Sequence, residues 1–319
     1  MKCLCCGKTI NQNAAESEKK WQWHKKCVVN FFHTKEMPVL DITKEQLEFL
    51  VNETVNEGLT VPGVQKKLSL HLSSDIDARL TIVDYPTGYI LKPQTEEFEN
   101  MPEFEDLAMR LAEIMGIQTV PHALIKMNGE YAYITKRIDR EITEKEIKLY
   151  AMEDFCQLSN RLTQDKYKGS YENCGRIIKK YSITPGLDLS ELYLRVVGSF
   201  IIGNSDMHLK NFSLRETEPG NRRFQLSNAY DMLPVNVIMP EDKEQMALTI
   251  NGKKRNIHKK EFKILAEVCD IPANAAEKMI EKLCVLENKM LSLVDESYLP
   301  QAQRDELKTL IRDRVAILL

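Results

Sequence analysis

Apolar residues alternate with polar ones over much of the first half of the chain, a pattern that is typical of strands. Alternating leucines and short apolar runs predict strands at 68–72, 80–83, 89–91, 123–125 and 131–134. Asn128-Gly129 separates the last two runs, and this dipeptide favours the type I′ turn of a tight hairpin. We expect the first three runs to form a β-meander.

Helical spacing of apolar residues dominates the second half. Before it, we expect a short helix over 43–57 and one that begins at Pro102 and ends at Gly116. From about residue 150 onward, the expected helices lie near 151–160, 171–181, 188–202, 259–268 and, in pieces, 274–316. This order predicts an α+β fold in which a β-rich lobe precedes an α-helical lobe, and it suits a cleft between lobes.

Composition limits the function classes only loosely. With 319 residues, 43% of them hydrophobic, the chain is long enough to bury a sizeable core. A formal net charge of -3 gives no basic footprint for nucleic acid or for an anionic membrane. The sequence has no apolar run of the about 18 residues that a membrane span needs, so we expect a cytoplasmic protein. Four cysteines are scattered singly and should be reduced core residues: Cys156, Cys174, Cys269 and Cys284.

The densest candidate chemistry lies in the polar segment 203–212, Gly-Asn-Ser-Asp-Met-His-Leu-Lys-Asn-Phe, which follows an apolar helix and reads as a loop. Short strands at 212–214 and 224–226 then predict a hairpin around Pro219-Gly220-Asn221. Because a hairpin returns its end to its beginning, we expect Asp231 to arrive beside Asn211 and Asp206.

These three side chains suit phosphoryl transfer. Magnesium prefers hard oxygen ligands and takes few of them from protein, so Asn211 and Asp231 fit as its ligands. Asp206 would orient an acceptor hydroxyl and take its proton, and the order loop Asp, loop Asn, hairpin, metal Asp is that of protein kinases. The alternative for any pair alone is that Asp and Asn cap helices and turns.

Two further segments could bind nucleotide phosphates. Lys92 ends the strand 89–92; it could be a solvated strand end, or it could pair with Glu103 or Glu105 on the helix that follows. Pro62-Gly63 has the composition of a tight turn whose amides could face phosphate, but a single glycine matches no established phosphate-loop pattern.

Taken together, the motifs resemble the HipA family of bacterial toxin kinases from about residue 58 to 236. They are GVQKKLSL, YILKP, ITKRIDR, MEDFCQ followed by KYKGSYE, GNSDMHLKNFSL and AYDMLP, in the order of the family. The resemblance implies an ATP- and magnesium-dependent serine/threonine protein kinase with a two-lobed, protein-kinase-like fold. It also implies the toxin of a toxin-antitoxin pair, which phosphorylates a translation-related protein such as an aminoacyl-tRNA synthetase and is held by a helix-turn-helix (HTH) antitoxin.

The resemblance also implies residue roles. Asp206 would be the catalytic aspartate, Asp231 and Asn211 would bind magnesium, and Lys92 would reach the phosphates. The remaining nucleotide contacts would come from the phosphate loop (Pro62, Gly63, Val64, Gln65, Lys66 and Lys67), the hinge strand (Lys136, Arg137 and Ile138), and Gln157, His208, Lys210 and Tyr230. Members of the family can autophosphorylate a serine in the phosphate loop, where this chain has Thr60, and we hypothesise that Thr60 is the inhibitory site.

The chain departs from long HipA proteins before the phosphate loop. Only about 40 to 60 residues precede that loop, so we expect a short form whose missing N-terminal subdomain is supplied by a separately encoded small protein. The expected domains are a zinc-knuckle-like head (1–36), a β-rich N-lobe with the phosphate loop (37–138) and an α-helical C-lobe with the catalytic loop (139–319).

The head carries metal-ligand spacing. Cys3-x2-Cys6 and His24-x2-Cys27 are separated by 17 residues and supply the four ligands of a closed, tetrahedral zinc site. Cys5 is surplus and could replace a neighbour, and the alternative is unligated thiols. Four aromatic residues should pack around the site or contact a partner: Trp21, Trp23, Phe31 and Phe32.

Two other classes of function compete with the kinase. A phosphohydrolase could use Asp206, His208 and Asp231 around two metals, but of six histidines only His208 lies in this cluster. A catalytically silent HipA-like binding module could act as a co-repressor with an HTH partner. The presence of Lys92, Asp206, Asn211 and Asp231 argues against that module.

Overall fold

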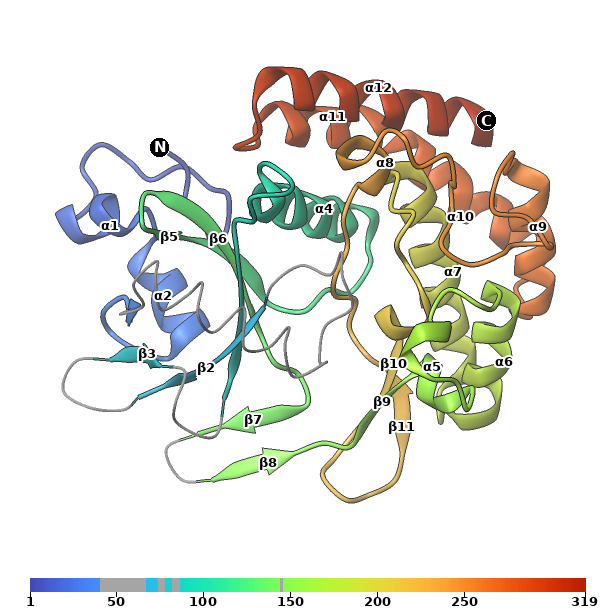
Figure 1. Ribbon diagram of the computed structural model, residues 1–319, viewed down its shortest axis with the longest axis horizontal. Helices are drawn as coiled ribbons and strands as arrows, with labels where there is room; N and C mark the ends of the chain where they lie inside the picture. Colours follow the sequence, from blue (N-terminus) through green and yellow to red (C-terminus); the bar gives the residue numbers. More distant parts are fainter. Residues whose placement is uncertain (41–66, 74–77, 82–86, 144–145) are drawn as a thin grey trace. The chain divides into compact units, whose positions relative to one another are not determined.

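The computed structural model describes residues 1–40, 67–73, 78–81, 87–143 and 146–319 (Figure 1). The chain divides into two compact units, which we call the β-rich unit (1–106 and 120–147) and the helical unit (107–119 and 148–319). The helix expected over 43–57 lies outside the described residues.

The β-rich unit is built on a six-stranded sheet with the order β1-β3-β2-β4-β6-β5. Its strands are β1 (Val39–Leu40), β2 (Leu68–Leu72), β3 (Arg79–Thr81), β4 (Tyr89–Pro93), β5 (His122–Met127) and β6 (Glu130–Lys136). The β1–β3 pair is parallel and the other pairs are antiparallel. β7 (Arg140–Ile142) and β8 (Ile147–Leu149) form a separate two-stranded sheet.

The sheet order corrects the expected meander. β2 lies between β3 and β4, with Leu70 opposite Tyr89 and Leu72 opposite Leu80, so β4 pairs with β2 and not with β3. Leu70, Leu80 and Leu91 are all buried. Burial of the apolar face determines which strands pair, so the strands do not pair simply in the order in which they follow one another along the chain. The predicted hairpin is confirmed: β5 and β6 pair around Asn128 and Gly129, both of which have positive φ, at 51° and 87°.

The first 36 residues pack onto this sheet. They contain two short helices, α1 (Glu16–Trp21) and α2 (Lys25–Phe32). The indole nitrogen of Trp23 donates to the carbonyl of Leu124 on β5 at 3.0 Å, and the rings of Phe31 and Phe32 lie 5.9 and 5.4 Å from that of Tyr89 on β4. Trp23, Phe31 and Phe32 are buried, so they anchor the head to the sheet, whereas Trp21 is only half-buried.

The helix predicted from Pro102 to Gly116 is confirmed as α4 (Met101–Met115), and the division between the units falls within it. Gly116 follows the helix with φ 87°, a left-handed conformation that glycine adopts without steric cost.

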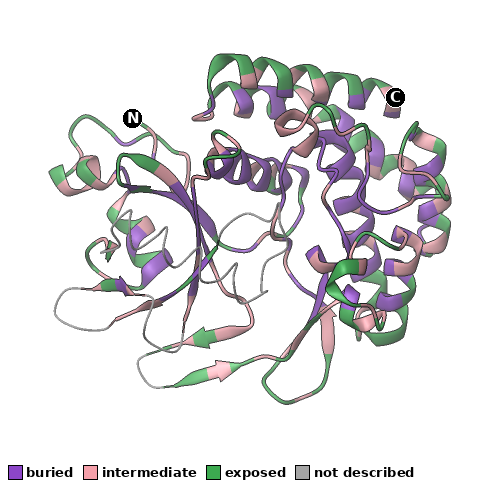
Figure 2. Ribbon diagram, viewed as in Figure 1, coloured by how far each residue is buried: buried purple, intermediate pink, exposed green. Residues whose placement is uncertain are grey.

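The helical unit is organised around α7 (Pro185–Ile202), against which α6, α9, α10 and α12 pack. Twelve of its eighteen residues are buried, which is typical of a helix enclosed on most sides (Figure 2). The other helices of this unit are α5 (Phe155–Leu158), α6 (Tyr171–Tyr181), α8 (Val235–Ile238), α9 (Lys259–Val268), α10 (Ala273–Val285), α11 (Glu287–Asp295) and α12 (Gln301–Leu318), with 3-10 turns η1 (Thr163–Asp165) and η2 (Leu209–Asn211).

One expected helix is largely wrong. Within 151–160, β9 (Met152–Asp154) is a strand and only α5 is helical. β9 pairs with β10 (Ser213–Glu216), which in turn pairs with β11 (Phe224–Leu226) as the predicted hairpin. Asp154 ends the strand and begins the helix, because its side chain accepts from the Gln157 amide while the Gln157 side chain accepts from the Asp154 amide.

The scattered cysteines are buried as expected: Cys156, Cys174, Cys269 and Cys284. Across the part of the chain that the structure describes, none of the helices combines the length and the apolar character that crossing a membrane would require.

Candidate active site

The polar segment 203–212 follows α7 directly. Gly203 ends the helix with φ 73°, and a Cβ at this position would lie 2.9 Å from a methyl carbon of Leu310 on α12. The left-handed backbone conformation therefore favours glycine, and a larger residue would also have to displace the Leu310 side chain. Near the end of the segment, η2 spans Leu209–Asn211.

A hydrogen-bonded network connects this loop to α8, to the segment after α8 and to α12. Ser205 donates to Asp242 Oδ2 at 2.9 Å, while Asn236 Nδ2 donates to the Glu244 carbonyl at 2.9 Å and to Ser205 Oγ at 3.2 Å. Arg314 on α12 donates to Asn236 Oδ1 at 3.1 Å. Connected, partly buried polar groups of this kind restrain the geometry of a loop, and the sequence alone did not point to Asn236.

Asp206 and Asn211 are joined across the loop. Asn211, which is buried, donates from Nδ2 to the Asp206 carbonyl at 2.9 Å, and this bond leaves its amide oxygen for another partner. Burial raises the pKa of the Asp206 carboxyl, and the charges of Asp231 and Asp242 add to this effect.

The hairpin β10–β11 returns the chain to the loop. Tyr230 donates to the Lys210 carbonyl at 3.0 Å, and its hydroxyl lies 2.5 Å from that of Ser213. Asp231 is the next residue and has φ 59°. Its negative charge acts to raise the pKa of both Asp206 and His208. The structure thus brings Asp231 near the loop, as the hairpin argument predicts.

His208 and Lys210 have different environments. His208 is 5% exposed and its Nδ1 has no hydrogen-bond partner among the described residues; burial, with Lys166 nearby, lowers its pKa to about 4, so it is neutral at pH 7. Lys210 instead pairs with Asp154 at 2.8 Å. Asp154 also caps α5 through Gln157, which connects the two predicted residues Lys210 and Gln157.

Tyr167 is a residue of this site that the sequence reasoning missed. Its hydroxyl donates to Asp206 Oδ1 at 2.5 Å, and its ring packs edge-on against His208 at 5.0 Å between centroids. Tyr167 belongs to the KYKGSYE motif, which was the available signal, but nothing in that motif indicates a contact with Asp206.

Lys92 in the β-rich unit forms a buried ion pair. Its ammonium lies 2.6 Å from Glu105 Oε1 and 5.6 Å from the centroid of the Tyr133 ring. This resolves the two sequence alternatives: the partner is Glu105, and Lys92 is not a solvated strand end. Glu103 is half-buried on the same helix, and burial raises its pKa.

The predicted hinge residues lie at the end of β6 and directly after it, and two of them have side-chain partners within the chain. Lys136 Nζ donates to the Asn30 carbonyl at 3.3 Å, and Arg137 pairs with Asp139 at 2.8 Å. Ile138 is half-buried. The backbone amides of Lys136 and Arg137 are engaged as well, since they donate to the carbonyls of Pro121 and Gly88 at 3.1 and 3.0 Å.

Most of the predicted phosphate loop lies outside the described residues: Thr60, Pro62, Gly63, Val64, Gln65 and Lys66. Lys67 is exposed immediately before β2.

The four predicted zinc ligands gather in the head. The ligand atoms of Cys3, Cys6, His24 and Cys27 all lie within 4.8 Å of one another. His24 Nδ1 is 3.4 Å from Cys6 Sγ and 3.8 Å from Cys27 Sγ, whereas Nε2 faces the Thr9 carbonyl at 3.3 Å. A second partner on the far nitrogen is the arrangement that orients metal-binding histidines, so this donor set fits zinc.

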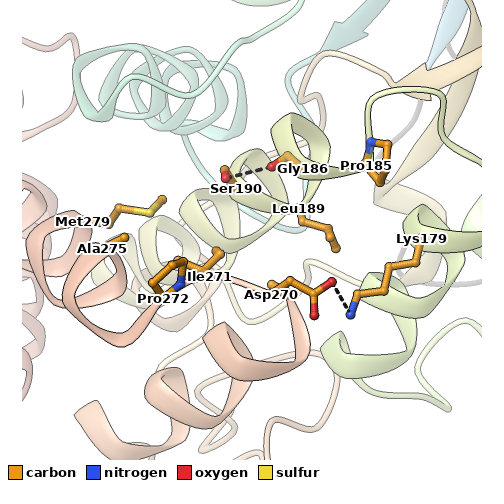
Figure 3. A pocket seen from close by; sticks show the side chains of 11 residues that line it. Lys179, Pro185, Gly186, Leu189, Ser190, Asp270, Ile271, Pro272, Ala275 and Met279 are labelled. Atoms are coloured by element: carbon orange, nitrogen blue, oxygen red, sulfur yellow. Dashed lines mark hydrogen bonds and ion pairs between the residues drawn. The ribbon is translucent and has the colours of Figure 1, made fainter.

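A cavity of about 340 Å³ in the helical unit is not part of the candidate active site (Figure 3). It is lined by residues of α6, α7 and α10 and of the turn before α10, including Leu189, Ile271 and Met279, and Lys179 pairs with Asp270 at its edge at 2.7 Å. None of its lining residues belongs to the loop 203–211.

Comparisons with known proteins agree on one family. The HipA-like C-terminal domain family matches residues 59–290. A protein named "Putative kinase" from Haemophilus influenzae is 22% identical over 306 residues, which cover 88% of both chains. "Putative kinase Y4dM" from Sinorhizobium fredii is 31% identical over 69% of this chain and 55% of its own length.

Solved structures share the fold. HipA of Shewanella oneidensis, determined with HipB and its operator DNA, has a TM-score of 0.67 and 17% identity over 80% of this chain and 64% of its own. The Helicobacter pylori proinflammatory kinase CtkA has a TM-score of 0.54 and 14% identity over 79% of this chain and 93% of its own. At these identities the likeness concerns the fold, an α+β arrangement of a curled sheet and a helical bundle.

Proposed function

Because the chain belongs to the HipA-like C-terminal domain family, we propose that it is an ATP- and magnesium-dependent serine/threonine protein kinase, the toxin of a toxin-antitoxin system. The observation that carries the proposal is the loop 203–211, in which Asp206 and Asn211 are joined and to which the hairpin returns Asp231. Family relatives named as kinases support the same activity.

The chain's own residues divide the work of phosphoryl transfer. The Asn211 amide oxygen and the Asp231 carboxylate would hold magnesium, whose charge offsets that of the nucleotide phosphates. Asp206 would orient the acceptor hydroxyl and take its proton. The network of Ser205, Asn236 and Arg314 would keep these groups in position. Their positions matter because misplacement of reacting groups lowers the rate steeply.

Further nucleotide contacts are proposed from the family's motifs. Lys92, oriented by Glu105, would contact the phosphates, as a strand lysine and a helix glutamate do in protein kinases. His208 is neutral, and its Nδ1 has no partner within the described ranges, so it suits a contact with a hydrogen-bond donor or a nucleotide oxygen, according to its tautomer. The segments 62–67 and 136–138 are further proposed nucleotide contacts.

The protein acceptor and the partners are inferred from the family. We propose a translation-related acceptor, such as an aminoacyl-tRNA synthetase, and an HTH antitoxin, since the Shewanella HipA was solved with HipB. A separately encoded small protein that resembles the HipA N-terminal subdomain is a further proposed partner. The competing proposal is a catalytically silent module that acts with an HTH partner.

Transfer of label from [γ-32P]-ATP to proteins of a bacterial lysate separates the two proposals. Wild type should label at least one protein, and Asp206→Ala should lower this labelling by about 100- to 10,000-fold, because that is the usual contribution of a general base. Binding of a fluorescent ATP analogue to both proteins serves as the control for folding. Absence of any Asp206-dependent labelled protein, with nucleotide binding retained, would favour the silent module.

We also propose that Cys3, Cys6, His24 and Cys27 bind a structural zinc ion. Their ligand atoms gather within 4.8 Å of one another, and metal binding would add folding free energy directly. Cys5 provides a matched control, since it neighbours Cys6 but does not belong to the cluster.

Metal analysis of purified protein tests the zinc proposal. Loss of a residue that only supports a metal ligand lowers metal affinity by about 10–100-fold. Cys6→Ser removes a ligand itself and should lower zinc affinity by more than this, whereas Cys5→Ser should retain the metal. Wild-type protein without zinc, or equal loss in both variants, would rule the site out.

A further inference from the structure

The hydroxyl of Tyr167 lies where a kinase would place the hydroxyl that it phosphorylates. Its Oη donates to Asp206 Oδ1 at 2.5 Å, and Asp206 is the proposed acceptor of the substrate proton. A hydroxyl that donates to this carboxylate has the starting arrangement of the transfer step. The same hydroxyl is close enough to Asp231 to be affected by its charge.

The surroundings of Tyr167 can accommodate a phosphate. The residue is 42% exposed and lies between η1 and α6, outside any helix or strand. Two ammonium groups face its ring, Lys166 at 4.9 Å and Lys254 at 6.0 Å from the centroid. Lysines this close to the ring can pair with the phosphate that the tyrosine would carry after transfer.

From this geometry we propose that Tyr167 is itself a phosphoryl acceptor, modified within its own chain. The inference rests on the proposed kinase function. The Oη–H bond breaks and its proton goes to the Asp206 carboxylate. The bond from the γ-phosphorus of ATP to the bridging oxygen breaks, a bond from that phosphorus to Oη forms, and ADP leaves.

The product would not keep the hydrogen bond from which it forms. Phosphotyrosine has no hydroxyl proton to donate, and its charge is repelled by Asp206, Asp231 and Asp242. Lys166 and Lys254, which lie 4.9 and 6.0 Å from the ring centroid, offer it cationic partners, although Lys254 also pairs with Glu244 at 3.0 Å. Modification therefore removes Tyr167 from Asp206 and leaves this carboxylate open to the hydroxyl of another protein.

Tyr181 is a matched comparison in the same unit. It is 38% exposed, and Lys180 lies 4.6 Å from its ring centroid, so its exposure and cationic neighbour resemble those of Tyr167. Across the described part of the chain, however, its hydroxyl donates to no carboxylate. If exposure and nearby lysine were sufficient, the two tyrosines would be modified equally.

Mass spectrometry of the full chain after incubation with Mg-ATP tests the proposal. In wild type, phosphate should accumulate on Tyr167 at least about tenfold faster than on Tyr181, since an oriented acceptor gains a rate advantage of this order or more. Asp206→Ala should show none on Tyr167, and Tyr167→Phe should carry one phosphate fewer by intact mass. The same digest covers Thr60, whose modification is a separate hypothesis.

A second measurement establishes that the reaction stays within one chain. The initial rate per chain should not change over a tenfold range of protein concentration. A tagged Asp206→Ala chain mixed with wild type should remain unmodified at Tyr167. Phosphate on the tagged chain would overturn the proposal, because it requires an acceptor presented from outside.

Proteins of a bacterial lysate in the same reaction separate this inference from the kinase proposal. Asp206-dependent phosphorylation of a lysate protein with unmodified Tyr167 would overturn the role of Tyr167 and leave the kinase function standing. Failure to modify either Tyr167 or any lysate protein, by protein that binds ATP, would overturn both.

Discussion

Each unit holds a lysine–carboxylate pair among its proposed nucleotide residues, and the two pairs differ in burial far more than in length. Lys92 and Glu105 in the β-rich unit lie 2.6 Å apart with side chains 8% and 0% exposed. Lys210 and Asp154 in the helical unit lie 2.8 Å apart with side chains 35% and 14% exposed.

This difference in burial distinguishes a pair that stabilises the fold from a pair that contributes mainly to nucleotide binding. A charge removed from a buried pair leaves its partner uncompensated in a medium of low dielectric constant. A charge removed from a partly exposed pair leaves a partner that water can solvate. Lys92 should therefore matter for folding as well as for nucleotide binding, and Lys210 for nucleotide binding alone.

The largest expected effect on stability follows from Lys92→Met. Glu105 would keep a buried carboxylate without its cation, which should cost about 3–5 kcal/mol in the free energy of unfolding. Urea unfolding followed by circular dichroism measures the loss. The double variant Lys92→Met/Glu105→Leu should recover most of it, since apolar side chains need no partner. Equal losses in the single and double variants would contradict the uncompensated charge as the cause.

A smaller loss should follow from Asn236→Ala, which removes the amide that joins Ser205, Glu244 and Arg314 in a partly buried network. Arg314 and the Glu244 carbonyl would each lose a hydrogen bond, at a cost of about 1–3 kcal/mol. Because Asn236 also holds Ser205, label transfer should fall by more than thermal stability accounts for. Unchanged transfer per folded molecule would show that the loop keeps its geometry without this network.

The smallest effect on stability should follow from Lys210→Met. A partly exposed ion pair contributes about 0–1 kcal/mol, so the free energy of unfolding should change by less than that of Lys92→Met. The KM for ATP should nevertheless rise about tenfold or more, because a charged hydrogen bond to phosphate is worth about 1.5–3 kcal/mol. Steady-state kinetics at varied ATP measures this, and an unchanged KM would place Lys210 outside the nucleotide site.

Local sequence signals accounted for much of the fold. The Asn128-Gly129 turn, the helix ended by Gly116 and the hairpin that carries Asp231 depend on residues close in sequence, and all three are present. The strand β9 was missed because its partner β10 lies about sixty residues further along the chain. The spacing of apolar residues within 151–160 carries no information about that distant pairing.

The same reasoning explains what was predictable in the site. Asp206 and Asn211 are five residues apart, so the loop itself reveals them. Tyr167 lies 39 residues before Asp206, and Asn236 reaches Ser205 over 31 residues. Such contacts depend on how α6, α7 and α8 pack, which side-chain periodicity does not encode. Whether Glu103 or Glu105 pairs with Lys92 likewise depends on how α4 packs against the sheet, which the sequence does not show.

A matched pair of substitutions tests the central claim most directly. Asp231 and Asp270 are both aspartates with left-handed φ, 59° and 54°, where asparagine is well tolerated, but only Asp231 lies at the loop. Single-turnover transfer from Mg-[γ-32P]-ATP should fall by about 100-fold or more in Asp231→Asn, since a metal ion contributes several kcal/mol to such a reaction. Asp270→Asn should transfer as wild type does. Equal rates in all three proteins would contradict the assignment of Asp231 to a magnesium-dependent phosphoryl-transfer centre.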